Sequence, residues 1–226
     1  MAKMLRVPYK MLSMPLPAEP LVPEKTVLLL INFQKFTCAR DHGLGRLAEE
    51  RGITPELDEY YSQVDAALQN GNQLVKACRV AGMDVVFSYL HTGSAGQKIS
   101  KQFQVSKIPV PDGELKDEFL ENIKPESGEI SLIQSTYSPF TGPDLLHVLE
   151  KKGKDTLIVA GMLFNYSVTM TAREAADRDY KVIVVWDASA SETLEWHLVT
   201  RTGLVGGLIL SRSTREVVEM LEGKRT

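Results

Sequence analysis

The stretch DTLIVAGMLFNYSVTMTAREAADRDYKVIVVW, residues 155–186, contains two apolar runs separated by a segment of helix length. The runs 155–160 and 181–186 are rich in Val, Ile and Leu and lack polar alternation, which is typical of strands buried on both faces. Residues 165–179 between them are expected to form a helix. A strand, a helix and a second strand in this order form the repeating unit of a parallel sheet, so the stretch indicates an α/β fold.

The same alternation continues on both sides of this stretch. Further strands are expected at 26–31, 84–90, 129–134 and near 207–210, and further helices at 54–82, 114–121, 142–152, 191–202 and from Ser213 onward. Thr54 and Pro55 are a typical cap and first-turn pair, and Ser213 with Glu216 forms a capping-box pattern. Residues 92–113 are polar and weakly periodic, so they predict a long loop. Six strands alternating with helices predict a parallel sheet with helices on both faces.

The composition excludes several classes of protein. The 226 residues fit one large domain or two small ones, and 43% hydrophobic with 24% charged residues is ordinary for a soluble folded chain. A net charge of −3 argues against a nucleic-acid-binding protein. The longest apolar runs are too short to cross a membrane. Cys38 and Cys78 are too few for a disulfide framework, so we expect reduced thiols and a cytoplasmic protein.

Residues 1–25 differ in composition from the rest of the chain. They hold four of the eight methionines and five of the eleven prolines, and Pro8 and Lys10 interrupt any signal-peptide pattern. We interpret them as an extended N-terminal arm that precedes one α/β domain, residues 26–226. The arm is either a floppy tail or a strap across a neighbouring subunit, and its apolar content favours the strap.

Ligand sites in parallel sheets lie beyond the carboxyl ends of the strands, which directs attention to 32–38, 91–96, 134–140 and 161–167. These segments contain no P-loop and no G-x-G-x-x-G pattern, so no nucleotide cradle is expected. His91 is at a predicted strand end, but no Asp or His stands near it at ligand spacing. We interpret it as a structural residue and expect neither a metal nor a cofactor.

Three segments and one histidine carry a family resemblance: LLLINFQ (28–34), SLIQSTYSPFTGPDL (131–145), VAGMLFNYSVTMTAREAADRDYKVIVVWDASAS (159–191) and His197. With these features the chain, from about residue 25 to its end, resembles the isochorismatase-like hydrolases, which include nicotinamidases, carbamoylsarcosine amidases and isochorismatases. The resemblance implies the Rossmann-like isochorismatase fold, a three-layer structure whose six parallel strands are ordered 3-2-1-4-5-6. It also aligns Met162–Leu163 with a position that often carries a non-proline cis peptide.

The chemistry implied by the resemblance is amide hydrolysis by a cysteine, assisted by an aspartate base, a lysine and backbone N–H groups. By position, Asn32 stands for the aspartate, Gln134 for the lysine and Ser167 for the cysteine, while Leu163 and Ser167 supply the oxyanion backbone. An amide does not accept a proton as a carboxylate does, and serine is a poorer nucleophile without a base. Asn32 also cannot act as the proton donor that isochorismatases use. The resemblance therefore predicts that ordinary cysteine-dependent amidase activity is absent.

The pocket around these positions is predicted to have a mostly apolar and aromatic wall that suits a flat or cyclic ligand. Its members are Phe33, Cys38, His91, Tyr137, Phe140, Phe164 and Tyr166. A displaced nucleophile is conceivable at Cys38, but a buried filler is the preferred interpretation. Asp41 and His42 could reach the cleft, yet no partner at suitable spacing makes either half of a catalytic pair.

Three functions stay open at this point. The first is binding of a small molecule without hydrolysis. The second is an active enzyme with rewired chemistry, either serine-based or non-hydrolytic, and the third is a structural subunit that pairs with an active relative. Members of the family usually form dimers or tetramers, so the resemblance implies a homodimer or homotetramer.

Overall fold

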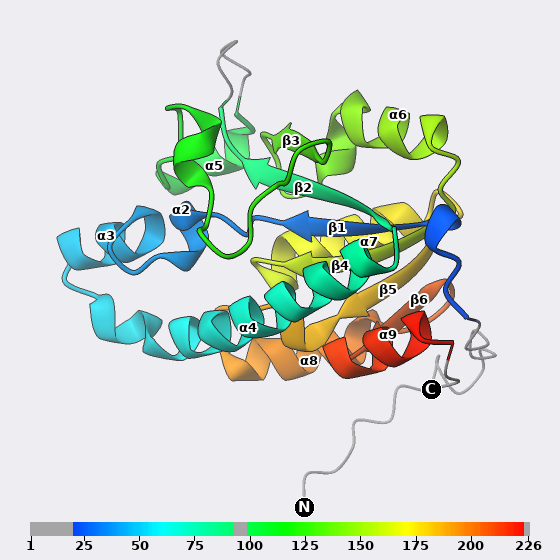
Figure 1. Cartoon of the computed structure of the whole chain (residues 1–226). Helices are drawn as coiled ribbons and strands as arrows, with labels where there is room; N and C mark the ends of the chain where they lie inside the picture. Colours follow the sequence, from blue (N-terminus) through cyan, green and yellow to red (C-terminus); the bar gives the residue numbers. More distant parts are fainter. Residues whose placement is uncertain (1–19, 93–98, 224–226) are drawn as a thin grey trace, which may run out of the picture.

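The apolar runs form one six-stranded sheet in the computed structural model, which describes residues 20–92 and 99–223 (Figure 1). The strands are β1 Thr26–Ile31, β2 Asp84–Leu90, β3 Ile130–Gln134, β4 Thr156–Gly161, β5 Lys181–Val185 and β6 Ile209–Arg212. All neighbouring pairs are parallel and the order is β3-β2-β1-β4-β5-β6. The predicted fold class and strand order are therefore confirmed.

Helices cover both faces of the sheet. Every residue of β1 is therefore buried, and its side chains alternate between two hydrophobic clusters. Leu28 and Leu30 face the cluster formed with α4 (Asp58–Val80) and α9 (Thr214–Leu221). The other face carries α6 (Pro143–Lys151) and α7 (Thr169–Ala176), with α8 (Leu194–Leu204) beside α7 (Figure 1). This is the continuous burial that uniformly apolar strands predict.

Several predicted boundaries shift, and short helices occupy segments expected to be loop. The helix expected from Thr54 starts as a 3-10 turn, Thr54–Leu57, before α4, and the helix expected at 114–121 is a 3-10 turn, Leu115–Glu118. The helix expected at 165–179 begins with a π-helical turn, Phe164–Val168. The helices missing from the prediction are α2 Lys35–Cys38, α3 Gly43–Glu50 and α5 Lys101–Ser106. The loop prediction for 92–113 is thus wrong at α5, while 93–98 lie outside the described residues. These helices are too short for their apolar pattern to complete more than about two turns.

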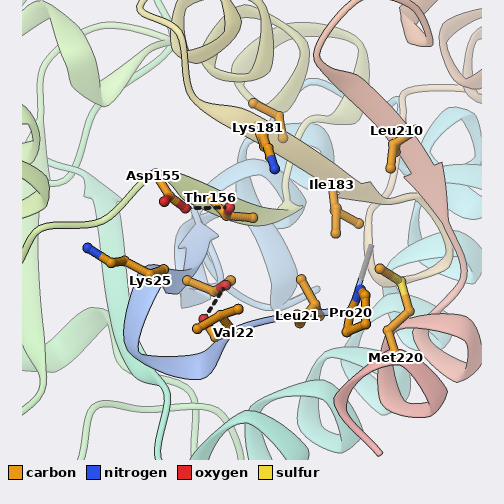
Figure 2. Close-up of a pocket in the computed structure, with 12 residues that line it drawn as sticks. Pro20, Leu21, Val22, Lys25, Asp155, Thr156, Lys181, Ile183, Leu210 and Met220 are labelled. Carbon is orange, nitrogen blue, oxygen red and sulfur yellow. Dashed lines mark hydrogen bonds between the residues drawn. The ribbon is translucent and has the colours of Figure 1, made fainter. Parts of the chain in front are cut away.

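The predicted arm is described only from Pro20. Residues 1–19 lie outside the described part of the chain, so the strap across a neighbouring subunit stays a prediction. Pro23–Lys25 form a 3-10 turn, and Leu21 packs against the first cluster. Figure 2 shows Leu21 and Pro20 near Met220 in a pocket of about 130 Å³. Thr26, Thr156 and Lys181, the first residues of β1, β4 and β5, line it, so it lies at the amino edge of the sheet.

No helix in the described residues combines the length and the apolar character needed to cross a membrane.

Gly161 at the end of β4 is required by two local constraints. Its φ is +147°, and a Cβ at this position would overlap the carbonyl group of Ile31, its partner on β1. We expect Gly161→Ala to lower the free energy of unfolding by about 3 kcal/mol, from backbone strain together with overpacking. Urea unfolding followed by circular dichroism measures this loss.

Gly113→Ala is the matched control, since a Cβ there meets nothing within 4 Å. A loss of unfolding free energy for Gly161→Ala no larger than that of this control would contradict the requirement for glycine at position 161.

Candidate functional site

Asn32 follows β1 and directs its side chain across the carboxyl edge of the sheet. It has a φ of +53°, in the left-handed region, which asparagine adopts more readily than most residues. Its backbone N–H donates to the Ser88 carbonyl at 2.8 Å, and the residue is 3% exposed. The turn leaves the amide among the ends of β2, β3 and β4.

The Asn32 amide makes four hydrogen bonds within this space. Its Nδ2 donates to the Met162 carbonyl at 2.7 Å and to Ser167 Oγ at 3.4 Å. Its Oδ1 accepts from Leu90 N at 3.1 Å and from Gln134 Nε2 at 3.0 Å. Two donated and two accepted bonds satisfy the full capacity of an amide. The structure therefore brings the three predicted positions, Asn32, Gln134 and Ser167, into one connected network.

Gln134 and Ser167 each accept a further hydrogen bond from a neighbouring element. Ser88 Oγ donates to Gln134 Oε1 at 2.6 Å, and the Ser167 carbonyl accepts from Thr171 Oγ1 at 2.6 Å. Ser167 lies in the π-helical turn and is 2% exposed, as against 3% for Gln134. The hydrogen-bonded chain from Ser88 to Ser167 carries no formal charge, so its polar atoms are buried without an ion.

The Met162–Leu163 peptide is cis, at the position that the resemblance indicated. Leu163 O accepts from the backbone N–H groups of Tyr166 and Val168, both at 3.2 Å. Its part in an oxyanion site remains a prediction.

The predicted wall residues have different environments. Phe33 and Phe164 are fully buried in the two opposite hydrophobic clusters, and Phe140 packs against Tyr180. Tyr137 and Tyr166 stack at a centroid distance of 5.2 Å and are only partly buried. Ligand contact by any of them remains a prediction.

Cys38 lies close to the network but is not activated. Its Sγ faces the Asn32 carbonyl at 3.8 Å. Burial raises the pKa of the Cys38 thiol to about 11, so the thiol is protonated at neutral pH. A protonated, buried thiol agrees with the filler interpretation rather than with a displaced nucleophile.

Two cavities lie at the carboxyl edge of the sheet, and neither has Asn32, Gln134 or Ser167 among its lining residues. One of about 410 Å³ lies between α3 and the segment 109–118, and His91 is among its lining residues. The other, of about 430 Å³, lies on the other side of α3 and is lined by Leu47, Tyr60, Leu163 and Glu192, among others. Both volumes are in the range of small-molecule sites.

His42 has a partner that the sequence did not reveal. Its Nε2 lies 3.1 Å from Oε1 of Glu118, a carboxylate that is 5% exposed. The other carboxylate oxygen accepts from Phe36 N at 2.9 Å and from Gln34 Nε2 at 3.1 Å. The sequence does not predict this contact, because 76 residues separate the pair and no local spacing reports it.

Metal binding is not indicated by these groups. Among residues 20–92 and 99–223, no three His, Cys, Asp or Glu side chains are arranged to hold an ion.

His197, part of the resemblance, is a buried side chain of α8. Its ring lies 4.9 Å from that of Phe164 and 6.3 Å from that of Trp186. Desolvation by burial, followed by the charge of Arg201, lowers the pKa of His197 below its usual value.

Comparison with known proteins agrees with this architecture. The family profile described as the isochorismatase domain matches residues 26–203. An uncharacterized isochorismatase family protein, YwoC of Bacillus subtilis, is 30% identical over 105 residues, which are 46% of this chain and 56% of that protein. The isochorismatase of the same organism is 28% identical over 110 residues, 49% of this chain and 35% of that protein. The chain thus spans between about a third and three fifths of the length of these two relatives.

A solved structure extends the likeness to the whole fold. The cysteine hydrolase from Pseudomonas syringae pv. phaseolicola 1448A superposes with a TM-score of 0.78 at 23% identity, covering 93% of this chain and 99% of that one. Beyond residue 203, β6 and α9 complete the same sheet and its helical cover.

The direction of the Asn32 hydrogen bonds predicts the effect of a charge at this position. In Asn32→Asp an oxygen replaces Nδ2 and faces the Met162 carbonyl, so the carboxyl group prefers its protonated form and its pKa rises. A raised acid pKa means that stability falls as pH increases above the unfolded value of about 3.9. We expect a loss of about 3 kcal/mol at pH 7 that shrinks toward pH 4, measured by urea unfolding.

Asn70→Asp provides the control, because Asn70 also donates to a carbonyl at 2.7 Å, that of Asp187, but is only partly buried. Equal losses for both variants would contradict the buried network.

The lowered pKa of His197 predicts a second pH effect. The folded state disfavours the imidazolium, so folding stability is lost as pH falls below the unfolded value of about 6.5. We expect the free energy of unfolding of the wild type to fall more steeply between about pH 7 and 5 than that of His197→Gln. Parallel curves of unfolding free energy against pH for the two proteins would contradict the lowered pKa of His197.

Proposed function

Because the chain belongs to the isochorismatase family, we propose that it binds a small uncharged molecule at Asn32, Gln134 and Ser167 without cysteine-type amide hydrolysis. The family's hydrolase-like fold is retained, and the proposal concerns only what this site does. The three positions are those that the resemblance aligns with the aspartate, lysine and cysteine.

One observation carries this proposal: Ser167 Oγ accepts a hydrogen bond from an amide N–H rather than facing a base. Nucleophilic attack by a serine needs a neighbouring group that removes the hydroxyl proton. The Nδ2 of Asn32 is a donor and its Oδ1 already accepts two bonds, so neither atom performs that task. The hydroxyl therefore binds and orients but is not deprotonated.

The absence of charged side chains in the network favours an uncharged ligand. A charged group placed among side chains that are 2–3% exposed would lose its hydration without meeting an opposite charge. Uncharged amide, carbonyl or hydroxyl groups exchange hydrogen bonds with Asn32, Gln134 and Ser167 at no such cost.

The ligand's apolar body has space in a cavity that borders the cis peptide rather than the three side chains themselves. Leu163 follows the cis peptide and also lines the cavity of about 430 Å³, where Leu47 and Tyr60 add apolar surface. A flat or cyclic compound with one polar end suits this combination of polar network and apolar wall.

A structural subunit without a ligand is the second candidate, and a specific observation favours it. The three side chains satisfy one another and are almost fully buried, so ligand binding requires that some of these hydrogen bonds open. The two candidates differ in whether any uncharged ligand stabilises the fold.

The test for hydrolysis uses nicotinamide, a carbamoyl amino acid and a ureide, with ammonia release as the measurement. We expect no turnover by the wild type or by Ser167→Cys, because the single change supplies a thiol without a base. The combined change Asn32→Asp, Gln134→Lys and Ser167→Cys restores the ionisable groups and is expected to raise the rate by at least about 100-fold over the single variant. Wild-type turnover that disappears in Ser167→Ala would overturn the proposal in favour of rewired serine chemistry.

The test for binding measures the thermal midpoint with nicotinamide and with an uncharged ureide in excess. A ligand at about 100 times its Kd adds about 2.7 kcal/mol of stability, and Gln134→Leu should remove that gain. No shift with any compound would favour the structural subunit.

A further inference from the structure

A histidine and a buried carboxylate meet at the wall of the cavity of about 410 Å³, between α3 and the segment 109–118. Glu118 is 5% exposed, and a carboxylate is costly to bury unless hydrogen bonds replace its hydration. Its Oε2 accepts from Phe36 N at 2.9 Å and from Gln34 Nε2 at 3.1 Å, and its Oε1 lies 3.1 Å from His42 Nε2. The proposed binding of an uncharged molecule uses neither His42 nor Glu118.

The direction of the Glu118 carboxylate is fixed by its donors. Gln34 is itself anchored to the end of β2, because its Oε1 accepts from Leu90 N at 2.8 Å and its Nε2 donates to Leu90 O at 3.1 Å. Phe36 N, the other donor, belongs to α2, which follows β1 closely. These contacts hold Oε2 and leave Oε1 directed toward His42. A charge that is fixed before a ligand arrives costs less to order on binding.

The contact with Glu118 assigns the roles of the two His42 nitrogens. An ionised carboxylate only accepts hydrogen bonds, so Nε2 carries the proton and donates to Oε1. In the neutral ring, Nδ1 is then an acceptor. The His42 side chain is 48% exposed and lines the cavity, so a ligand there can reach the ring. The pair therefore favours a ligand that offers an N–H or O–H donor.

Acidic side chains predominate among the described residues that line this cavity. The charged members of the lining are Arg46, Glu50, Asp112, Glu114, Asp117 and Glu118. Arg46 is ion-paired with Glu50 at 3.3 Å, so its guanidinium charge is offset. Lys116, which is outside the lining, offsets Glu114 at 2.7 Å. The other three carboxylates give the cavity a net negative charge, which attracts a cation.

Apolar side chains form much of the remaining wall. Phe36 and Leu47 belong to α2 and α3, and Pro109, Val110 and Pro111 belong to the segment across the cavity. This surface suits the hydrocarbon part of an organic ligand. A bare metal ion fits less well, since the described part of the chain has no three His, Cys, Asp or Glu groups arranged to hold one. The lining therefore favours an organic cation.

We propose that this cavity binds a small organic cation that has a primary ammonium group and a short apolar body. The ammonium group donates a hydrogen bond to His42 Nδ1, and the carboxylates of Asp117 and Glu118 compensate its charge. The apolar body packs against Val110 and its two neighbouring prolines. A quaternary ammonium group has no N–H for Nδ1, and an uncharged group gains nothing from the carboxylates, so both are poorer ligands.

This site is separate from the one at Asn32, Gln134 and Ser167, because none of these three residues lines the cavity. It also differs in charge preference, since the hydrogen-bonded network at Asn32 consists of uncharged side chains. The two proposals are therefore tested by different ligands, and either can fail without the other.

The test is isothermal titration calorimetry of the full chain with benzylammonium chloride at neutral pH and low ionic strength. We expect one saturable site per chain. Benzyl alcohol and benzyltrimethylammonium, which keep the ring but lack the charge or the N–H donor, should compete at least about 10-fold more weakly. No saturable binding of benzylammonium would overturn the proposal, as would competition of equal strength by either analogue.

Substitutions locate the binding to this cavity. His42→Leu removes the acceptor and should raise the benzylammonium Kd at least about 10-fold, whereas His42→Gln keeps an acceptor and should recover part of this loss. Asp117→Asn should raise the Kd about 3-fold by removing one charge. The matched control Glu195→Gln, which removes an exposed carboxylate from α8 instead, should leave the Kd unchanged. Far-UV circular dichroism checks that each variant is folded.

Nicotinamide distinguishes the two sites. In excess, it should leave the benzylammonium Kd unchanged, because an uncharged ligand is expected at the Asn32 network and not in this cavity. Competition by nicotinamide together with an unchanged Kd in His42→Leu would place the cation at the network and overturn the proposal. A rise in Kd that is equal for Glu195→Gln and Asp117→Asn would also overturn it, since the effect would then come from net charge alone.

Discussion

The hydrogen bonds of the Asn32 amide are the interaction on which the carboxyl edge of the sheet depends. A single side chain at the end of β1 reaches Leu90 of β2, Gln134 of β3 and the Met162 carbonyl after β4. The left-handed backbone of Asn32 is what turns the amide across these ends. Donors and acceptors are matched in number, so the uncharged amide leaves no polar atom of its own unsatisfied at this position.

Glu118 and His42 lie in a second layer of side chains around this network. Gln34 Oε1 accepts from Leu90 N, the same N–H that contacts Asn32, and Gln34 Nε2 donates to Glu118. Glu118 in turn holds His42 at the edge of a cavity. The ionisable side chains Glu118 and His42 thus line the cavity, while the hydrogen-bonded chain from Ser88 to Ser167 contains only uncharged side chains. This arrangement supports the proposed preference for an uncharged ligand.

The sequence predicts the sheet well because the strands are apolar throughout, as TVLLLI at 26–31 illustrates. It also predicts that Asn32, Gln134 and Ser167 lie together, since each is at or after the carboxyl end of a strand and these ends share one edge. The pairing of His42 with Glu118 is not predictable in this way, because it joins segments 76 residues apart through one carboxylate. Short helices such as α3 escape prediction for a related reason: tertiary contacts, not a long periodic pattern, hold them in place.

The central claim is that the Asn32 amide is buried and fully hydrogen-bonded in the folded protein. Hydrogen exchange of its side-chain NH₂ group, assigned by comparison with Asn32→Ala in ¹⁵N-labelled protein, measures this most directly. The account predicts exchange at least about 1000-fold slower than that of the exposed Gln69 side chain, because only opening of the sheet edge releases these protons. Exchange of both amides at similar rates would contradict it.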